Sequence, residues 1–209
     1  MTIAALFVAT NGVYFNLPDV EPWDITRDVR LYPGPHPVIA HPPCERWGRY
    51  WHGGPSAKVR RVKGDDDGCF ASALSSVRRW GGVLEHPAHS AAWAAHGIFR
   101  PPSAGGWIAA DVDGVGFTCH VEQGHYGHRA RKATWLYAVP VSLDVPLPTL
   151  VWGPSSSVRL DYGYHSAEER RLATRHRGDP IERMGKRERT ATPIPFRDLL
   201  LTLTKGPTP

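Results

Sequence analysis

The feature that most constrains how this chain can fold is a short apolar run followed closely by two consecutive prolines. Residues 38–40 read Val-Ile-Ala, the pattern of a buried strand. His41, Pro42 and Pro43 follow at once, and tandem prolines cannot extend a central strand because they donate no ladder hydrogen bond. Cys44 therefore comes directly after a strand's carboxyl end, where open α/β sheets bind their ligands. The ordinary alternative for a lone cysteine is a small buried residue after a turn.

A second strand end repeats this arrangement. Residues 83–84 are apolar and lead directly into Glu85, His86 and Pro87. A short buried strand is again followed by a polar group and then by proline. The two strand ends therefore supply a thiol at Cys44 and a carboxylate at Glu85.

Hydrophobic periodicity and turn residues predict the other elements. Residues 69–80 carry apolar side chains at helical spacing, and Gly81 and Gly82 stop this helix. Residues 107–110 and 116–121 predict a hairpin. Further predicted elements are strands at 3–9 and 134–139, a short helix at 88–96 and a final helix at 194–204.

The composition narrows the class of protein. A net charge of +5 and a pI near 9.3 favour an anionic partner. Several of the eight tryptophans stand beside basic residues, a mixture that suits stacking on bases. Three cysteines without a CxxC pair indicate a reduced, intracellular setting. No apolar run approaches the ~18 residues of a membrane span, and the first residues read as a strand rather than a signal peptide, so we expect a cytoplasmic protein without a membrane partner.

The residue types at the two strand ends suit pyrimidine chemistry. A thiolate at Cys44 can add to C6 of a pyrimidine and make C5 nucleophilic. An acid near N3, here Glu85, would stabilise the negative charge that the addition creates. Arg129 and Arg131, spaced to project on one side of an extended strand, can hold the acid, the thiolate or a phosphate.

Basic residues near these positions predict contacts with a nucleic-acid backbone, although a solvated surface loop is an equal alternative for the segment after Cys44. The predicted contacts are Arg46, Lys58, Arg60, Arg61, Lys63, His125 and Lys132.

A metal site is a further alternative. The spacing of the suitable ligand types matches no closed zinc site, but a metal-dependent hydrolase or nuclease stays open. Phosphate-loop, dinucleotide-binding and nucleophile-elbow motifs are absent. The suitable ligand types are His41, Cys44, Cys119, His120, His125 and His128.

These residues are where the chain resembles the cytosine-5 DNA methyltransferases, especially the short members from bacteriophages. Residues 38–44 look like the family's catalytic Pro-Pro-Cys loop. Residues 83–87 resemble its Glu-Asn-Val or Glu-Asn-Pro strand end, with His86 in place of asparagine. Residues 123–135 are similar to a Tyr-Gly…Arg-Lys-Pro-Thr segment of phage relatives. The resemblance covers roughly residues 3–138.

The arginine motif belongs to the same resemblance. Arg129 and Arg131 match the alternating arginines of the family's Gln-x-Arg-x-Arg motif, with Gly127 in place of the glutamine. The resemblance implies that Cys44 is the nucleophile and that Glu85 is the acid at N3. It further implies that the arginines position the base or phosphate, and that the base is flipped out of the duplex or already free.

The resemblance also implies a reduced Rossmann-like α/β fold with a mostly parallel sheet and flanking helices. We expect this domain over residues 1–150, and a basic C-terminal extension over 151–209 that packs back through its terminal helix. The family's cofactor is S-adenosylmethionine, and the partners expected are DNA or a pyrimidine nucleotide. The family's target-recognition domains are usually longer than any segment available here, so sequence specificity is expected to be either loose or supplied by a protein partner. The residues that correspond to the cofactor site are Phe7, Asn11, Gly12, Asp24, Asp28 and Pro42.

The turn after the first strand departs from the family. Residues 6–12 stand where the family has Phe-x-Gly-x-Gly, and Gly12 is the only glycine there. Close approach of a backbone to a cofactor generally needs glycine. Two alternatives therefore remain: a thiol-dependent pyrimidine-modifying enzyme with another donor, and a non-catalytic module that binds DNA or protein.

Overall fold

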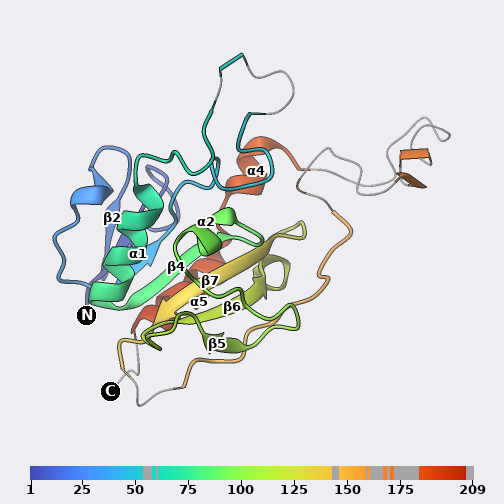
Figure 1. Ribbon diagram of the computed structural model, residues 1–209. Coiled ribbons are helices and arrows are strands. Elements are labelled where there is room, and N and C mark those ends of the chain that lie inside the picture. Colours follow the sequence, from blue (N-terminus) through green and yellow to red (C-terminus); the bar gives the residue numbers. More distant parts are fainter. Residues whose placement is uncertain are drawn as a thin grey trace.

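A computed structural model describes residues 1–53, 58–59, 61–142, 146–158, 160, 167–168, 170–171 and 184–205. The strands form one seven-stranded sheet in the order β2-β1-β3-β4-β7-β6-β5 (Figure 1). The strands are β1 (Ile3–Leu6), β2 (Val20–Trp23), β3 (Val38–Ala40), β4 (Gly82–Pro87), β5 (Trp107–Ala109), β6 (Phe117–Glu122) and β7 (Ala133–Val139). The helices are α1 (Cys69–Trp80), α2 (Ala91–Ala95), α4 (Lys186–Thr190) and α5 (Ile194–Lys205), with 3-10 turns η1 (Val29–Leu31) and η2 (Gln123–Tyr126).

The sheet is mixed, which corrects the expectation of a mostly parallel one. Strand β1 pairs in parallel with β2 and β3, and β3 pairs in parallel with β4. The pairings β4–β7, β7–β6 and β6–β5 are antiparallel. The reason is the length of the connections, since a parallel pair needs a crossover of a dozen or more residues. Strands β5, β6 and β7 follow one another through a turn and the short η2, which only allow the chain to reverse.

The parallel half contains a point where the chain changes direction across the sheet. Strands β2 and β3 lie on opposite sides of β1. The β1–β2 connection packs Tyr14 and Phe15 on one face of the sheet, whereas the β3–β4 connection places α1 on the other. Right-handed crossovers in opposite directions must use opposite faces. The crevice outside the carboxyl ends of β1 and β3 is therefore the expected ligand position in such a sheet.

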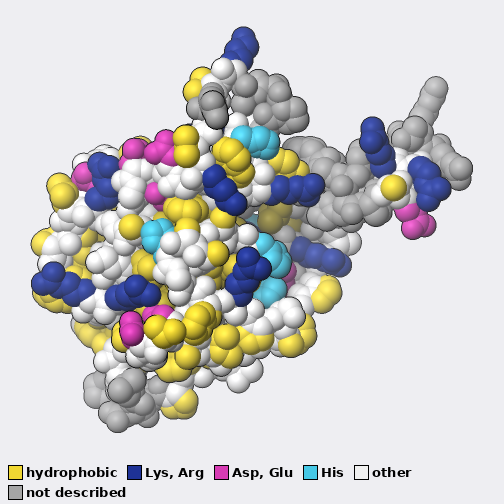
Figure 2. All heavy atoms as spheres, in the orientation of Figure 1, with side chains coloured by type: hydrophobic (Ala, Val, Ile, Leu, Met, Phe, Trp, Pro, Cys, Tyr) yellow, Lys and Arg dark blue, Asp and Glu magenta, His cyan; other side chains and the backbone are white. Residues whose placement is uncertain are grey.

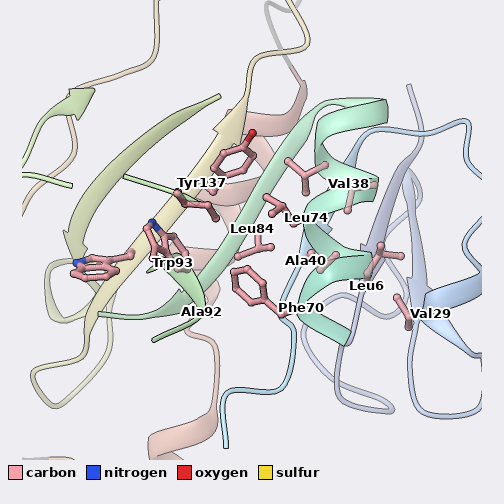
Figure 3. Packing of buried hydrophobic residues seen from close by; sticks show 14 of the residues in the cluster. Leu6, Val29, Val38, Ala40, Phe70, Leu74, Leu84, Ala92, Trp93 and Tyr137 are labelled. Carbon is pink, nitrogen blue, oxygen red and sulfur yellow. The ribbon is translucent and has the colours of Figure 1, made fainter. Parts of the chain in front are cut away.

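Two hydrophobic layers hold the sheet between its helices. On one face, α1 buries Phe70 and Leu74 against Leu84 of β4, and Trp93 of α2 joins the same cluster (Figure 3). On the other face, α5 buries Phe196, Leu200 and Leu203. Figure 1 shows α1 and α2 in front of the sheet and α5 behind it. The predicted helix at 69–80 is confirmed, and the final helix has the inward-facing side that its periodicity predicted.

Two local features differ from expectation. The first strand ends at Leu6 instead of residue 9, because Phe7 adopts a left-handed φ of 59° that a strand cannot contain. Strand β2 has no counterpart among the predicted elements. It contains Pro22, which an edge strand tolerates because one side of its backbone needs no ladder partner.

No described helix is long and apolar enough to cross a membrane. On the face of the molecule in Figure 2, lysine and arginine side chains are spread among apolar and histidine side chains rather than gathered in one patch. The positive net charge is therefore not concentrated on this face.

Candidate functional site

The alternation of side chains along the strands decides which polar groups meet. In β4, Val83 packs on the α5 face and Leu84 on the α1 face. Glu85 therefore faces α5, and His86 faces α1, where it contacts Phe70. The strand end after β3 follows the same alternation, since Ile39 faces α5 and His41 is two residues further.

Glu85 is held by hydrogen bonds from two directions. Its Oε2 lies 3.0 Å from His41 Nδ1, and its Oε1 accepts a hydrogen bond of 3.0 Å from Gln123 Nε2. His41 Nε2 in turn lies 2.9 Å from the hydroxyl of Tyr14. Gln123 Nε2 also donates to Thr134 Oγ1 at 2.9 Å. Both carboxylate oxygens of this nearly buried side chain are thus satisfied.

These contacts determine the charge of Glu85. Burial raises its pKa, but the hydrogen bond and positive charge of His41, together with the charges of Lys132 and His86, lower it more, to about 2. Glu85 is therefore ionised at neutral pH.

Cys44 shares the electrostatic surroundings of Glu85. The residue is exposed and follows Pro43 at the carboxyl end of β3. Desolvation of the sulfur raises the pKa of its thiol, and the negative charge of Glu85 raises it further, whereas Lys132 opposes them. The thiol is therefore mainly protonated at neutral pH, and a nucleophilic role requires a group that removes its proton.

The two predicted arginines donate hydrogen bonds to other groups than Glu85. Arg129 donates from Nε and Nη2 to the carboxylate of Glu188 in α4, at 2.7 and 3.0 Å. Arg131 donates to the backbone carbonyl of Ser156. Both precede the first residue of β7, so they do not alternate along a strand. His41 and Gln123 hold the acid in the place where arginines were expected.

The predicted nucleic-acid contacts are dispersed. Lys58, Arg61 and Lys63 are exposed, whereas Arg60 lies outside the described residues. Arg46 is half-buried, and its Nη1 has no hydrogen-bond partner in the described chain. Two further predicted contacts are tied to backbone carbonyls: the ring of exposed His125 lies 3.3 Å from that of Gly153, and Lys132 Nζ donates to that of Ala191 at 3.2 Å.

The turn after β1 is closed by its own chain. Phe7 and Asn11 have left-handed φ values of 59° and 56°. Gly12 donates its N–H to the carbonyl of Ala9 at 2.9 Å, and a Cβ at Gly12 would lie 2.7 Å from that oxygen. The backbone of this turn thus bonds to itself rather than presenting a row of glycine N–H groups.

The acids expected to meet a cofactor are also engaged. Asp24 Oδ2 accepts from the hydroxyl of Thr10 at 2.5 Å, and its Oδ1 accepts from Thr26 N and Oγ1 at 3.0 and 2.7 Å. Asp28 caps η1 and pairs with Arg30 at 2.8 Å. The sixth corresponding residue, Pro42, is buried. The residues at this position therefore do not fit S-adenosylmethionine in the manner that the family resemblance implies.

The histidines that the structure describes do not gather into a metal site. Among the described residues, no group of three or more His, Cys, Asp and Glu side chains could hold a metal ion. Cys119 is buried in the core on the α5 face, and His120 pairs with Trp135 across β6 and β7. The ring of His128 lies 2.9 Å from the carbonyl of Ala130.

Sequence reasoning missed four members of the network, among them Thr134, which was predicted only as part of a strand. Tyr14 lies in an irregular loop, and no local pattern marks it. Gln123 carried a usable signal, because it follows Cys119 and Val121 at a spacing of two and so continues their face of the sheet. His41 was recognised as a ligand type but not as the partner of Glu85.

Comparisons with known proteins identify no relative of this chain. No protein-family model matches the sequence, and no curated protein or solved structure is significantly similar to it. Similarity therefore assigns the chain to no family.

Proposed function

We propose that this protein modifies cytosine, a pyrimidine base, at C5, in DNA or in a nucleotide, through a covalent adduct between Cys44 and C6 of the base. The observation that carries the proposal is the position of Cys44. It is an exposed thiol at the carboxyl end of β3, beside the point where the order of the parallel strands reverses, and it lies within the electrostatic reach of the carboxylate of Glu85.

The chemistry begins at sulfur. The exposed thiol of Cys44 first releases its proton to solvent. The thiolate then forms a bond to C6 of cytosine, the C5–C6 double bond becomes a C4–C5 double bond, and the electrons of the C4–N3 double bond move to N3, which takes up a proton. The product is a neutral enamine whose C5 is nucleophilic. Lys132 favours the thiolate because its charge lowers the pKa of Cys44. Glu85 is the acid proposed to face N3.

No step of the proposal uses S-adenosylmethionine, because Asp24 and the turn at Gly12 are occupied by their own chain. From the methyltransferase resemblance, the proposal uses only the Rossmann-like character of the parallel half and the roles of Cys44 and Glu85. The donor group at C5 belongs to another electrophile, and a protein partner would supply sequence specificity.

The test requires no donor. In D₂O, an adduct at C6 lets C5 gain a deuteron; when the S–C6 bond breaks, C5 loses its original proton, and the net change is exchange at C5. Single-stranded and duplex oligonucleotides and free pyrimidine nucleotides are incubated with the protein, and exchange is followed by NMR and mass spectrometry. We expect exchange with the wild type, none with Cys44→Ser, and full exchange with the control Cys69→Ser.

Two results would contradict the proposal. One is exchange that persists in Cys44→Ser, which would exclude this thiol as the nucleophile. The other is absence of exchange with every substrate in the wild type. It would favour the second candidate, a non-catalytic nucleic-acid-binding module, whose binding measured by fluorescence anisotropy would be unchanged in Cys44→Ser. The engaged state of Asp24 and Asp28 is the observation that favours this candidate.

A further inference from the structure

Tyr14, His41 and Glu85 form a continuous hydrogen-bonded chain, and the charge at its Glu85 end acts on the thiol of Cys44. The His41 ring lies between the other two side chains, with its nitrogens 2.9 Å from the Tyr14 hydroxyl and 3.0 Å from Glu85 Oε2. Tyr14 is 2% exposed, and the side chains of His41 and Glu85 are 13% and 12% exposed. The three residues come from the β1–β2 connection, the end of β3 and the middle of β4, so the fold of the parallel half brings them together.

The two partners determine the tautomer of the His41 ring. An ionised Glu85 can only accept, so His41 Nδ1 carries a hydrogen. Within the described chain, the Tyr14 hydroxyl has no hydrogen-bond acceptor other than His41. Neutral His41 therefore accepts the hydrogen of Tyr14 at Nε2 and donates from Nδ1 to Glu85.

We propose that His41 and Glu85 act as one acid–base unit that delivers a proton to N3 of the pyrimidine, and that Tyr14 is the positioning residue that fixes the His41 ring. This inference rests on the proposed function. The unit takes up one proton from water before the reaction. As the sulfur of Cys44 bonds to C6, Glu85 passes that proton to N3, which leaves a carboxylate and a neutral imidazole. When the adduct reverses, the same proton returns from N3 to the unit.

The charges around His41 and Glu85 favour a carboxylate at Glu85 and a protonated hydroxyl at Tyr14. Lys132 and the ring of His41 stabilise the Glu85 carboxylate. The stored proton lies between His41 Nδ1 and Glu85 Oε2, which are 3.0 Å apart. Tyr14 keeps its own proton, because burial and the nearby negative charge of Glu85 raise its pKa well above the ordinary value for tyrosine. Among the described residues, the other groups whose charge acts on Tyr14 or Glu85 are Arg197 and Asp198 of α5, and His86, which lies on the opposite face of β4; Glu85 in turn acts on Cys44.

The unit is tested first without any assay of activity. In the full chain, ¹⁵N NMR of the imidazole nitrogens reports which nitrogen of neutral His41 carries hydrogen. We expect the Nδ1–H tautomer in the wild type and mixed tautomers in Tyr14→Phe and Glu85→Gln. Tyr126→Phe is the matched control, because its hydroxyl accepts from Val151 N at 2.9 Å and does not touch His41. An Nε2–H tautomer, or a spectrum that Glu85→Gln leaves unchanged, would overturn the inference.

The second part of the test measures the rate of deuterium exchange at C5 as a function of pH. His41→Asn keeps an N–H directed at Glu85 but cannot store a proton, so we expect the exchange rate to fall about 100-fold and its dependence on pH below neutrality to flatten. A rate and pH profile like those of the wild type would overturn the inference and leave the proposed function standing. A wild type without exchange would remove the proposed function, and the NMR result alone would then decide whether His41 and Glu85 form a unit.

Discussion

His86 makes the stability of this protein depend on pH in a way that one substitution can isolate. The side chain is 1% exposed and lies against the rings of Phe70 and Trp93. In the described chain, neither ring nitrogen has a hydrogen-bond partner of ordinary geometry. Burial lowers the pKa of His86 from 6.5 to about 4, against weaker opposing effects from Glu85, Asp66 and the Pro43 carbonyl.

The magnitude follows from proton binding to the two states. As pH falls below 6.5, the unfolded chain binds a proton at His86 while the folded protein stays neutral there until about pH 4. Stability is therefore lost between these two pKa values, an interval of about 2.5 pH units. At ~1.4 kcal/mol for each unit, the loss attributable to His86 is about 3 kcal/mol. Burial also lowers the pKa values of His96, His120 and His128, so the quantity to compare is the difference between proteins.

His86→Leu removes this titration while it keeps a side chain of similar volume in the aromatic cluster. We expect its free energy of unfolding at pH 7 to equal or exceed that of the wild type, because two unpaired polar atoms leave the core. Between pH 7 and pH 4 the wild type should lose about 3 kcal/mol more than the variant. Urea unfolding followed by tryptophan fluorescence measures both. His89→Asn, at an exposed histidine, is the control and should behave as the wild type does. Parallel curves for the wild type and His86→Leu would refute the reasoning.

Two further predictions concern the site. Glu85→Gln removes a charge that raises the thiol pKa of Cys44, and Lys132→Met removes one that lowers it. Alkylation by iodoacetamide at pH 7.5, measured on the Cys44 peptide, should therefore be several-fold faster in the first variant and slower in the second; equal rates would show that neither charge reaches the sulfur. Thr134→Val and Thr118→Val each remove a buried hydroxyl and should cost ~1–3 kcal/mol in urea unfolding. Only Thr134→Val, which belongs to the Glu85 network, should also alter the alkylation rate.

The elements predicted well are those with local causes. Strand β3 ends where tandem prolines remove the ladder donors, and α1 ends where apolar periodicity meets Gly81 and Gly82. The four residues of β2 carry no alternation that could be recognised, and their strand conformation depends on pairing with β1. In the antiparallel half, the predicted hairpin is confirmed by the antiparallel pairing of β5 and β6. The antiparallel pairing of β7 with β6 and β4 was missed, because strand direction depends on the connections and not on the residues of the strands themselves.

The residues of the candidate site likewise fall into those that local sequence predicts and those that only tertiary contacts bring together. Strand-end reasoning placed Cys44 and Glu85 at the same end of the sheet, because each follows or belongs to a strand of the parallel half. From its spacing, Arg129 was expected to hold the acid, the thiolate or a phosphate. In the structure, Arg129 reaches Glu188, which is remote in the sequence, and no local pattern contains that contact. The side chains of Tyr14 and Gln123 join the network through contacts between residues that are distant in the sequence, so these contacts exist only in the assembled sheet.

Glu85 lies on β4, the strand at which the two halves of the sheet meet. On one side, β3 is parallel and its end supplies His41; on the other, β7 is antiparallel and joins β4 to β6, whose end supplies Gln123. One carboxylate oxygen is thus bound from each half. The antiparallel half contributes a fixed amide donor that cannot titrate, whereas the parallel half contributes a ring that can. The change of strand direction at β4 therefore places Glu85 between one partner that positions it and one that can exchange a proton with it.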